Sequence, residues 1–144
     1  MTNSDNKIEV MITSALDNLD LVQALTNCVT AFMMFDEDSA HWVGMSVREA
    51  VTNAIQHGNK LDPVKKVEVC YEMAPERLVI SVRDQGCGFH ADEIPNPLEG
   101  DNLLKPSGRG VFYMRTFMDE VEFHAMTTGG TEVYMVKLKA TDSN

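Results

Sequence analysis

The sequence has little positive charge, few cysteines and no long apolar run. Lys and Arg together number 12 against 22 Asp and Glu, which gives a net charge of −10. This balance argues against a protein that coats DNA or RNA, because such proteins need a basic surface stripe. It does not argue against a bound nucleotide, since a small glycine-lined pocket can hold phosphates within an acidic protein. We therefore expect no direct nucleic-acid partner.

Membrane segments are also missing from the sequence. No apolar run approaches the ~20 residues that a membrane-spanning helix needs. Residues 1–7 are polar and lack the apolar core of a signal peptide. We therefore expect a cytoplasmic protein without a membrane partner.

The three cysteines, Cys28, Cys70 and Cys87, are widely spaced and form no C-x-x-C pair. This arrangement is typical neither of a disulfide framework nor of a zinc site. Cys28 and Cys70 lie among apolar neighbours and are predicted to be buried as small hydrophobic residues. The four histidines are scattered and show no metal-binding spacing.

The length and composition favour one globular domain. The chain has 144 residues, of which 44% are hydrophobic and 24% charged, as in an ordinary single-domain protein. We expect a disordered tail at residues 1–6, a single domain at 7–140 and a second tail at 141–144.

The apolar periodicity predicts an alternation of helices and strands. The predicted strands are residues 7–13, 64–73, 77–83, 120–127 and 131–139, and the predicted helices are residues 17–34, 36–58 and 110–118. The first helix is expected to begin at a cap formed by Asp17 or Asn18, and the second to stop at Gly58. The fold class expected from this order is α+β: a two-layer sandwich of three helices on a mixed, mostly antiparallel sheet.

Apolar residues at helical spacing predict which face of each long helix packs on the sheet. In the first helix they are Leu21, Val22, Leu25, Val29 and Phe32. In the second helix they are Val43, Val47, Ala50, Val51 and Ala54.

A polar stripe runs along the other side of the second helix. Glu49, Asn53 and His57 recur four residues apart, so they lie on one side of the helix. A carboxylate and a carboxamide one turn apart can serve as a proton acceptor and as a ligand of a hard cation. For an isolated motif, a solvated helix face would be the simpler interpretation. The stripe becomes informative only if the rest of the chain can bind a nucleotide.

Three glycine-containing turns follow the polar stripe. The first, residues 84–89 (DQGCGF), comes directly after a strand, and Asp84 there can accept a hydrogen bond from an exocyclic amine such as that of adenine. The second, residues 107–110 (SGRG), opens a helix, where free N–H groups favour phosphate. The third, residues 129–131 (GGT), is a turn before the last strand. Each motif alone is a weak signal.

In this order, the motifs resemble those of the GHKL, or Bergerat-fold, ATPase superfamily. The resemblance runs from about Ser46 to Leu138. The N box matches residues 48–58 (REAVTNAIQHG), and the glycine boxes match residues 82–89 (VRDQGCGF), 106–111 (PSGRGV) and, in reduced form, 129–133 (GGTEV). Within the superfamily, the short chain is similar to the anti-sigma-factor serine/threonine kinases of bacteria.

The resemblance implies roles for the polar residues. It implies that Glu49 is the general base for a substrate hydroxyl and that Asn53 coordinates a magnesium ion that bridges the ATP phosphates. Asp84 would bind the adenine amino group, with Thr131 behind it. His57 would lie near the nucleotide, although a histidine that stabilises the helix C-terminus is an equally simple interpretation.

The resemblance also implies roles for the glycines and two cations. Gly86 and Gly88 would form the floor of the pocket, Gly108 and Gly110 would hold the phosphates, and Lys105 and Arg109 would neutralise phosphate charge. Arg109 has the alternative of pairing with an acidic neighbour. Residues 84–107 would form the ATP lid.

The function that the resemblance implies is an ATP- and magnesium-dependent serine/threonine kinase that acts as an anti-sigma factor. Its implied partners are a STAS-type antagonist, which it phosphorylates, and a sigma factor or other effector, which it holds. The N-terminal strand and helix would form a homodimer surface. An alternative is a nucleotide-gated binding module without significant kinase activity, which would need the same pocket. A histidine-kinase catalytic domain is disfavoured, because no phosphoacceptor hairpin precedes the N box and His41 is too close to it.

Overall fold

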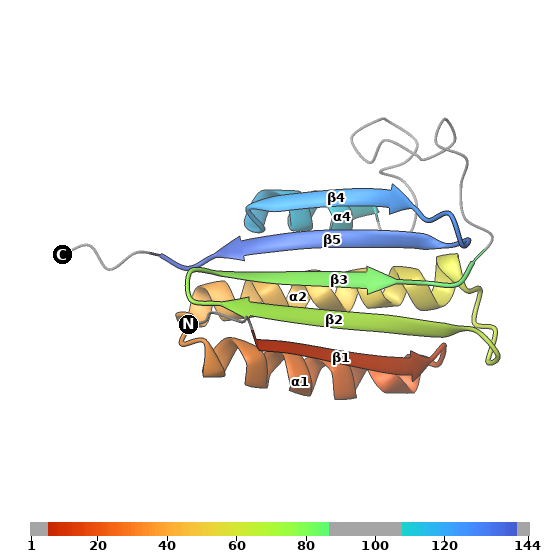
Figure 1. Ribbon diagram of the computed structural model, residues 1–144, viewed down its shortest axis with the longest axis horizontal. Helices are drawn as coiled ribbons and strands as arrows, with labels where there is room; N and C mark the ends of the chain where they lie inside the picture. Colours follow the sequence, from red (N-terminus) through yellow and green to blue (C-terminus); the bar gives the residue numbers. More distant parts are fainter. Residues whose placement is uncertain (1–5, 87–107, 141–144) are drawn as a thin grey trace.

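The computed structural model describes residues 6–86 and 108–140. Five strands form one sheet, and three helices cover one of its faces (Figure 1). The strands are β1 (Asn6–Thr13), β2 (Lys66–Ala74), β3 (Arg77–Arg83), β4 (Glu120–Ala125) and β5 (Thr131–Leu138). The helices are α1 (Leu19–Phe32), α2 (Glu37–Asn53) and α4 (Gly108–Phe117), with a 3₁₀ turn at Leu16–Asn18 and a π-helical turn at Ala54–Gly58.

The strand order is β1-β2-β3-β5-β4, and all four pairings are antiparallel. The α+β two-layer sandwich is therefore confirmed, although the described residues contain no parallel pair of the kind that a mixed sheet implies. Strand β1 begins at Asn6, which pairs with Met73, so the first strand starts one residue earlier than predicted.

The core lies between the helices and the sheet. The predicted buried face of α2 is confirmed, because Val43, Val47, Ala50 and Val51 are all inaccessible or nearly so. These residues recur at the 3.6-residue helical period and meet the alternate, inward-facing residues of the strands. The opposite face of the sheet carries no helix in the described structure (Figure 1).

The prediction for α1 was wrong at two of its five apolar positions. Leu21 and Phe32 are each 68% exposed, and Cys28, which was predicted to be buried, lies exposed on the same side of the helix. Thr26 is buried instead, since its hydroxyl donates to Val22 O and bonds the Tyr71 hydroxyl at 2.7 Å. A threonine with its hydroxyl satisfied can occupy a core position, so apolar spacing alone misplaced the buried stripe.

The expected cap of the first helix also differs. Asn18 is the N-cap residue of α1, but its side chain does not bond the helix N–H groups. Its Nδ2 donates back to the carbonyl and hydroxyl oxygens of Thr13, at 3.0 Å each. The side chain therefore ties the helix entrance to the end of β1. In α2, by contrast, Asp36 caps the helix by accepting from Ser39 N at 3.2 Å.

The second helix changes its geometry before it ends. The last turn, Ala54–Gly58, is π-helical, and Asn59 N donates to Ala54 O at 2.8 Å. Single π turns inside helices are often found at functional sites. The helical run ends at Gly58, as predicted, but left-handed backbone occurs at Lys60 and Leu61, with φ of 55° and 61°. A different reason must therefore account for a glycine at position 58.

Candidate functional site

The predicted polar and glycine motifs converge at one end of the sandwich. Asp84 follows directly after β3, and its backbone N–H donates to Thr131 O at the start of β5, at 3.0 Å. The π turn that ends α2 contacts the same place, because Gly58 packs against the Asp84 carboxylate. Three motifs from distant parts of the chain therefore surround one carboxyl group.

Asp84 is held by two backbone amides. It is 8% exposed, and its Oδ1 accepts from Gly86 N at 3.0 Å and from Thr131 N at 3.1 Å. Burial raises the pKa of Asp84, and the two N–H bonds and the charge of Lys65 oppose that rise. Because Oδ1 takes both bonds, Oδ2 is the oxygen that can accept from the amino group of a ligand. Thr131 acts on Asp84 through its backbone N–H.

Three glycines make room around Asp84. A Cβ atom on Gly58 would overlap Oδ2 of Asp84, one on Gly130 would overlap its backbone oxygen, and one on Gly86 would overlap the carbonyl of Gly58. Gly130 also has φ of 92°, in the left-handed region that favours glycine. Gly58 and Gly130 are thus site residues that sequence reasoning missed, although both lie within motifs that it singled out.

Glu49 packs against the start of α4. A Cβ atom on Gly110 would overlap the Cγ and Cδ atoms of Glu49, so the glycine leaves the space that this side chain fills. Glu49 is half-buried, and this burial raises its pKa. Loss of water disfavours the charged form and increases the affinity of the carboxylate for a proton, which suits a general base.

Asn53 lies one turn after Glu49 and carries a polar atom without a protein partner. Its Oδ1 is buried and has no hydrogen bond to any described residue. A buried oxygen of this kind is costly unless something else bonds it. Carboxamide oxygens are ligands of hard cations, and magnesium in nucleotide sites takes only one or two protein ligands beside phosphates and water. The atom therefore fits a magnesium ligand, and the described residues contain no separate cluster of three or more His, Cys, Asp or Glu.

The remaining predicted residues are only partly described. His57 is exposed on the π turn. Gly108 and Arg109 are the first residues of α4, at the end where backbone N–H groups are free. Gly88 and Lys105 lie outside the described residues, as does the predicted lid beyond residue 86. The ligand contacts of all five remain predictions.

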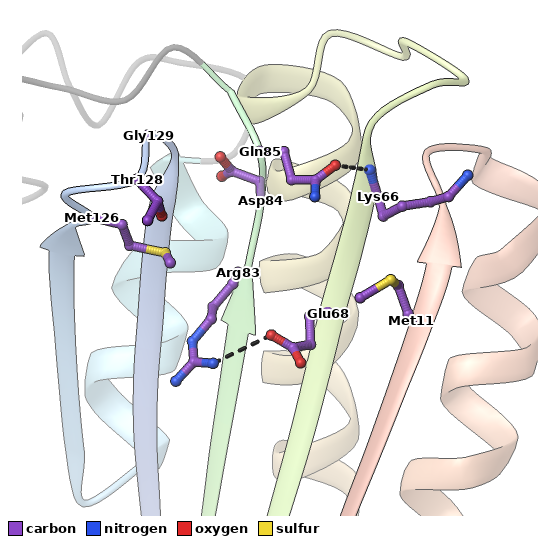
Figure 2. Close-up of a pocket in the computed structure, with 9 residues that line it drawn as sticks. All are labelled: Met11, Lys66, Glu68, Arg83, Asp84, Gln85, Met126, Thr128 and Gly129. Atoms are coloured by element: carbon purple, nitrogen blue, oxygen red, sulfur yellow. Dashed lines mark hydrogen bonds and ion pairs between the residues drawn. The ribbon is translucent and has the colours of Figure 1, made fainter.

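A hollow of about 280 Å³ opens on the face of the sheet that no described helix covers, at the end of the sheet where Asp84 lies (Figure 2). Arg83 and Glu68 line it and form an ion pair at 3.2 Å. Arg83 also pairs with Glu132 at 2.7 Å. Because two carboxylates already engage this guanidinium, Arg83 offers a phosphate group little free positive charge.

Comparison with known proteins agrees with the geometry. Residues 12–137 match the model of the histidine kinase-like ATPase domain family. The chain is similar to the anti-sigma F factor of Clostridium perfringens (strain SM101 / Type A), with 30% identity over 135 residues, 92% of this chain and 96% of that protein. It is also similar to the serine-protein kinase RsbW of Bacillus subtilis (strain 168), with 27% identity over 143 residues, 95% of this chain and 88% of that one.

The fold also recurs in a solved structure. The crystal structure of the RsbU and RsbW domains of Rv1364c from Mycobacterium tuberculosis superposes with a TM-score of 0.68 at 16% identity. The match covers 94% of this chain and 33% of that one. No helix among residues 6–86 and 108–140 is long and apolar enough to cross a membrane. The family match over residues 12–137 and the two relatives show that the chain belongs to the histidine kinase-like ATPase family, an ATP-binding family, within its group of anti-sigma-factor serine kinases.

Proposed function

We propose that this chain is a cytoplasmic serine/threonine kinase and anti-sigma factor. It would transfer the γ-phosphoryl group of ATP to a hydroxyl of a STAS-type antagonist, and it would hold a sigma factor or other effector until that antagonist displaces it. The observation that carries the proposal is the half-buried Glu49, one helical turn from the unpartnered Oδ1 of Asn53. A module that only bound ATP would not need a desolvated carboxylate there.

The site residues divide the work of phosphoryl transfer, which depends mainly on positioning and charge neutralisation. Asp84 would fix the adenine through Oδ2, and the first N–H groups of α4 would bind phosphate oxygens. Glu49 would accept the proton of the attacking hydroxyl. Magnesium, when bound through Asn53, would neutralise phosphate charge. The same residues would serve ATP binding and transfer.

Incubation with γ-labelled ATP and the STAS-type proteins of the same genome tests the proposal. We expect acid-stable label on a serine or threonine of one antagonist. Binding of ATP and of a partner without any transferred label would instead identify a nucleotide-gated binding module. Acid-labile label on a partner histidine would identify a histidine-kinase activity, and either result would refute the proposed kinase.

Asn53→Ala is expected to remove most of the effect of magnesium on ATP affinity. The variant deletes the buried oxygen that would ligate the ion, so the ratio of ATP affinities with and without magnesium should fall by about tenfold or more, the low end of what even outer-shell partners of a metal contribute. Calorimetric titration of ATP in magnesium and in EDTA measures this ratio.

Thr52→Ala is the matched control for Asn53→Ala. Thr52 is the preceding residue, and its hydroxyl donates to Arg48 O, at 2.7 Å, within the same helix. We expect its magnesium response to equal that of the wild type. An equal magnesium response in Asn53→Ala would rule out Asn53 as the ligand.

We propose that a homodimer forms through β1 and α1. Strand β1 is at the edge of the sheet and pairs only with β2 in the described structure. Edge strands pair readily with other chains, and the neighbouring α1 exposes the large apolar side chains of Leu21 and Phe32. Light scattering of the purified protein would detect the dimer, and a monomer at micromolar concentration would refute it.

A further inference from the structure

The residue that follows the N box occupies an unusual place in the structure. Asn59 comes directly after the π turn and is 1% exposed, although its side chain is polar. Buried polar side chains of native proteins are normally hydrogen-bonded, and those with several partners hold their surroundings in one arrangement. None of the motif assignments gives Asn59 a role.

Asn59 bonds three separate segments of the chain. Its Oδ1 accepts from Gln85 N at 2.7 Å, and its Nδ2 donates to Ser14 Oγ at 2.8 Å and to Lys66 O at 2.9 Å. Both amide hydrogens and one oxygen lone pair are thus used. Ser14 extends the network, because its hydroxyl donates to Lys65 O at 2.6 Å. The carboxamide therefore joins the end of β1, the start of β2 and the turn after β3.

The bond to Gln85 acts directly on Asp84. The N–H of Gln85 belongs to the same peptide unit as the carbonyl of Asp84, so Asn59 holds this unit from one side. Gly130 packs on the Asp84 carbonyl from another side. The side chains of Asp84 and Gln85 point in different directions at the end of β3 (Figure 2). The Gln85 side chain is held in turn, because its Oε1 accepts from Lys66 N at 2.6 Å. The orientation of the Asp84 carboxylate thus depends on a peptide unit that Asn59 fixes.

We infer that Asn59 is a positioning residue for adenine recognition, which acts by holding the Asp84–Gln85 peptide unit. The inference rests on the proposed function, in which Asp84 accepts from the adenine amino group. Asparagine suits this place because one short side chain supplies two donors and an acceptor. Aspartate has the same shape but loses both donors and places a charge beside Lys66 O. Alanine leaves Gln85 N, Ser14 Oγ and Lys66 O without this partner.

The test compares adenine with guanine nucleotides in Asn59→Ala and Asn59→Asp. A carboxylate accepts from the amino group of adenine, whereas guanine presents an oxygen there. We expect the Kd for ATP to rise about tenfold or more, because a displaced Asp84 carboxylate loses its hydrogen bond to the adenine amino group. The Kd for GTP should change much less, so the selectivity for ATP should fall. The rate of phosphoryl transfer at saturating ATP should stay within about threefold, because Glu49 is untouched.

Thr26→Val is the matched control, because it also removes buried side-chain hydrogen bonding, at a position that none of the site motifs includes. Thr26 is fully buried and bonds Tyr71 in the core between α1 and β2. Thr26→Val and the Asn59 variants should all unfold at a lower temperature than the wild type. Nucleotide binding is therefore measured below the unfolding temperature of every variant. Thr26→Val is expected to keep the wild-type selectivity for ATP, whereas the Asn59 variants are expected to lose it. Ser14→Ala, which removes one of the three bonds, should give a smaller loss and serves as the test if Asn59→Ala does not fold.

Two results would overturn the inference in different ways. If Asn59→Ala, or Ser14→Ala in its place, is less stable but keeps the wild-type ATP Kd and ATP-over-GTP ratio, the network is only structural, while the proposed function stands. If the wild-type protein itself binds neither nucleotide, the proposed function fails and this inference fails with it. The inference is supported if the Asn59 variants bind ATP less tightly relative to GTP than the wild type does, while Thr26→Val keeps the wild-type ratio of affinities.

Discussion

Glu49→Gln is expected to slow phosphoryl transfer to the antagonist by on the order of 10²–10⁴-fold, the range for removal of a general base. Glutamine keeps the size of the side chain that fills the space beside Gly110 but cannot accept the proton. ATP affinity should change little, because Asp84 and Asn53 are intact. Single-turnover transfer of labelled phosphate, with a parallel ATP titration, separates the two quantities.

The pH profile gives a second signature of the base. Burial raises the pKa of Glu49, and the base must be deprotonated to act. The wild-type rate should therefore fall as the pH is lowered through this raised pKa, at a higher pH than an ordinary carboxyl group would give. Glu49→Gln should lack that acidic limb.

Glu37→Gln is the matched control, since it makes the same chemical change in the first turn of the same helix, where Glu37 is exposed. We expect wild-type transfer from this variant. Transfer by Glu49→Gln at the wild-type rate and with the wild-type pH profile would exclude Glu49 as the base.

Gly58→Ala is expected to weaken ATP binding by on the order of 10–10²-fold. The new methyl group would overlap the Asp84 carboxylate, and Asp84 cannot simply retreat, because its N–H bonds Thr131 and its carbonyl packs on Gly130. The carboxylate would therefore turn away from the ligand, and a hydrogen bond to a buried group is worth about 1–3 kcal/mol when its partner is lost. Isothermal titration with ATP measures the change.

Gly44→Ala in the middle of α2 is the control for Gly58→Ala. A Cβ atom at position 44 would meet Gln23 Nε2 at 2.6 Å, the far end of a flexible side chain that can move aside. Alanine inside a helix is favoured over glycine by about 1 kcal/mol, so this variant should be at least as stable as the wild type and bind ATP equally well. Wild-type ATP affinity in Gly58→Ala would show that Asp84 does not depend on this glycine.

The secondary structure and the active-site motifs were largely predictable from the sequence. Strand alternation and helical spacing depend on neighbouring residues, so they placed the five strands, the three helices and the buried face of α2 correctly. The polar pair Glu49 and Asn53 was also visible, because residues four apart share one side of a helix. The π turn was not, because it keeps the same residues and changes only their hydrogen bonds.

The errors and omissions concern residues whose roles depend on distant partners. Thr26 is buried because Tyr71, 45 residues away, bonds its hydroxyl. The helix ends at Gly58 as predicted, but it is the nearby Asp84 carboxylate, and not a left-handed backbone, that requires glycine there. Asn59 bonds Ser14 and Gln85, which are 45 and 26 residues away. Periodicity within one segment carries no information about such pairs.

The sequence by itself determined the order of the elements, the family motifs and the chemical types in the site, because these depend on residue identity and short spacing. Only the tertiary structure decided which groups share the site: it places Gly58, Gly86 and Gly130 around Asp84, Gly110 against Glu49, and Asn59 behind the turn after β3. The physical reason is that close packing and hydrogen bonding act between segments that the fold, not the chain, makes neighbours.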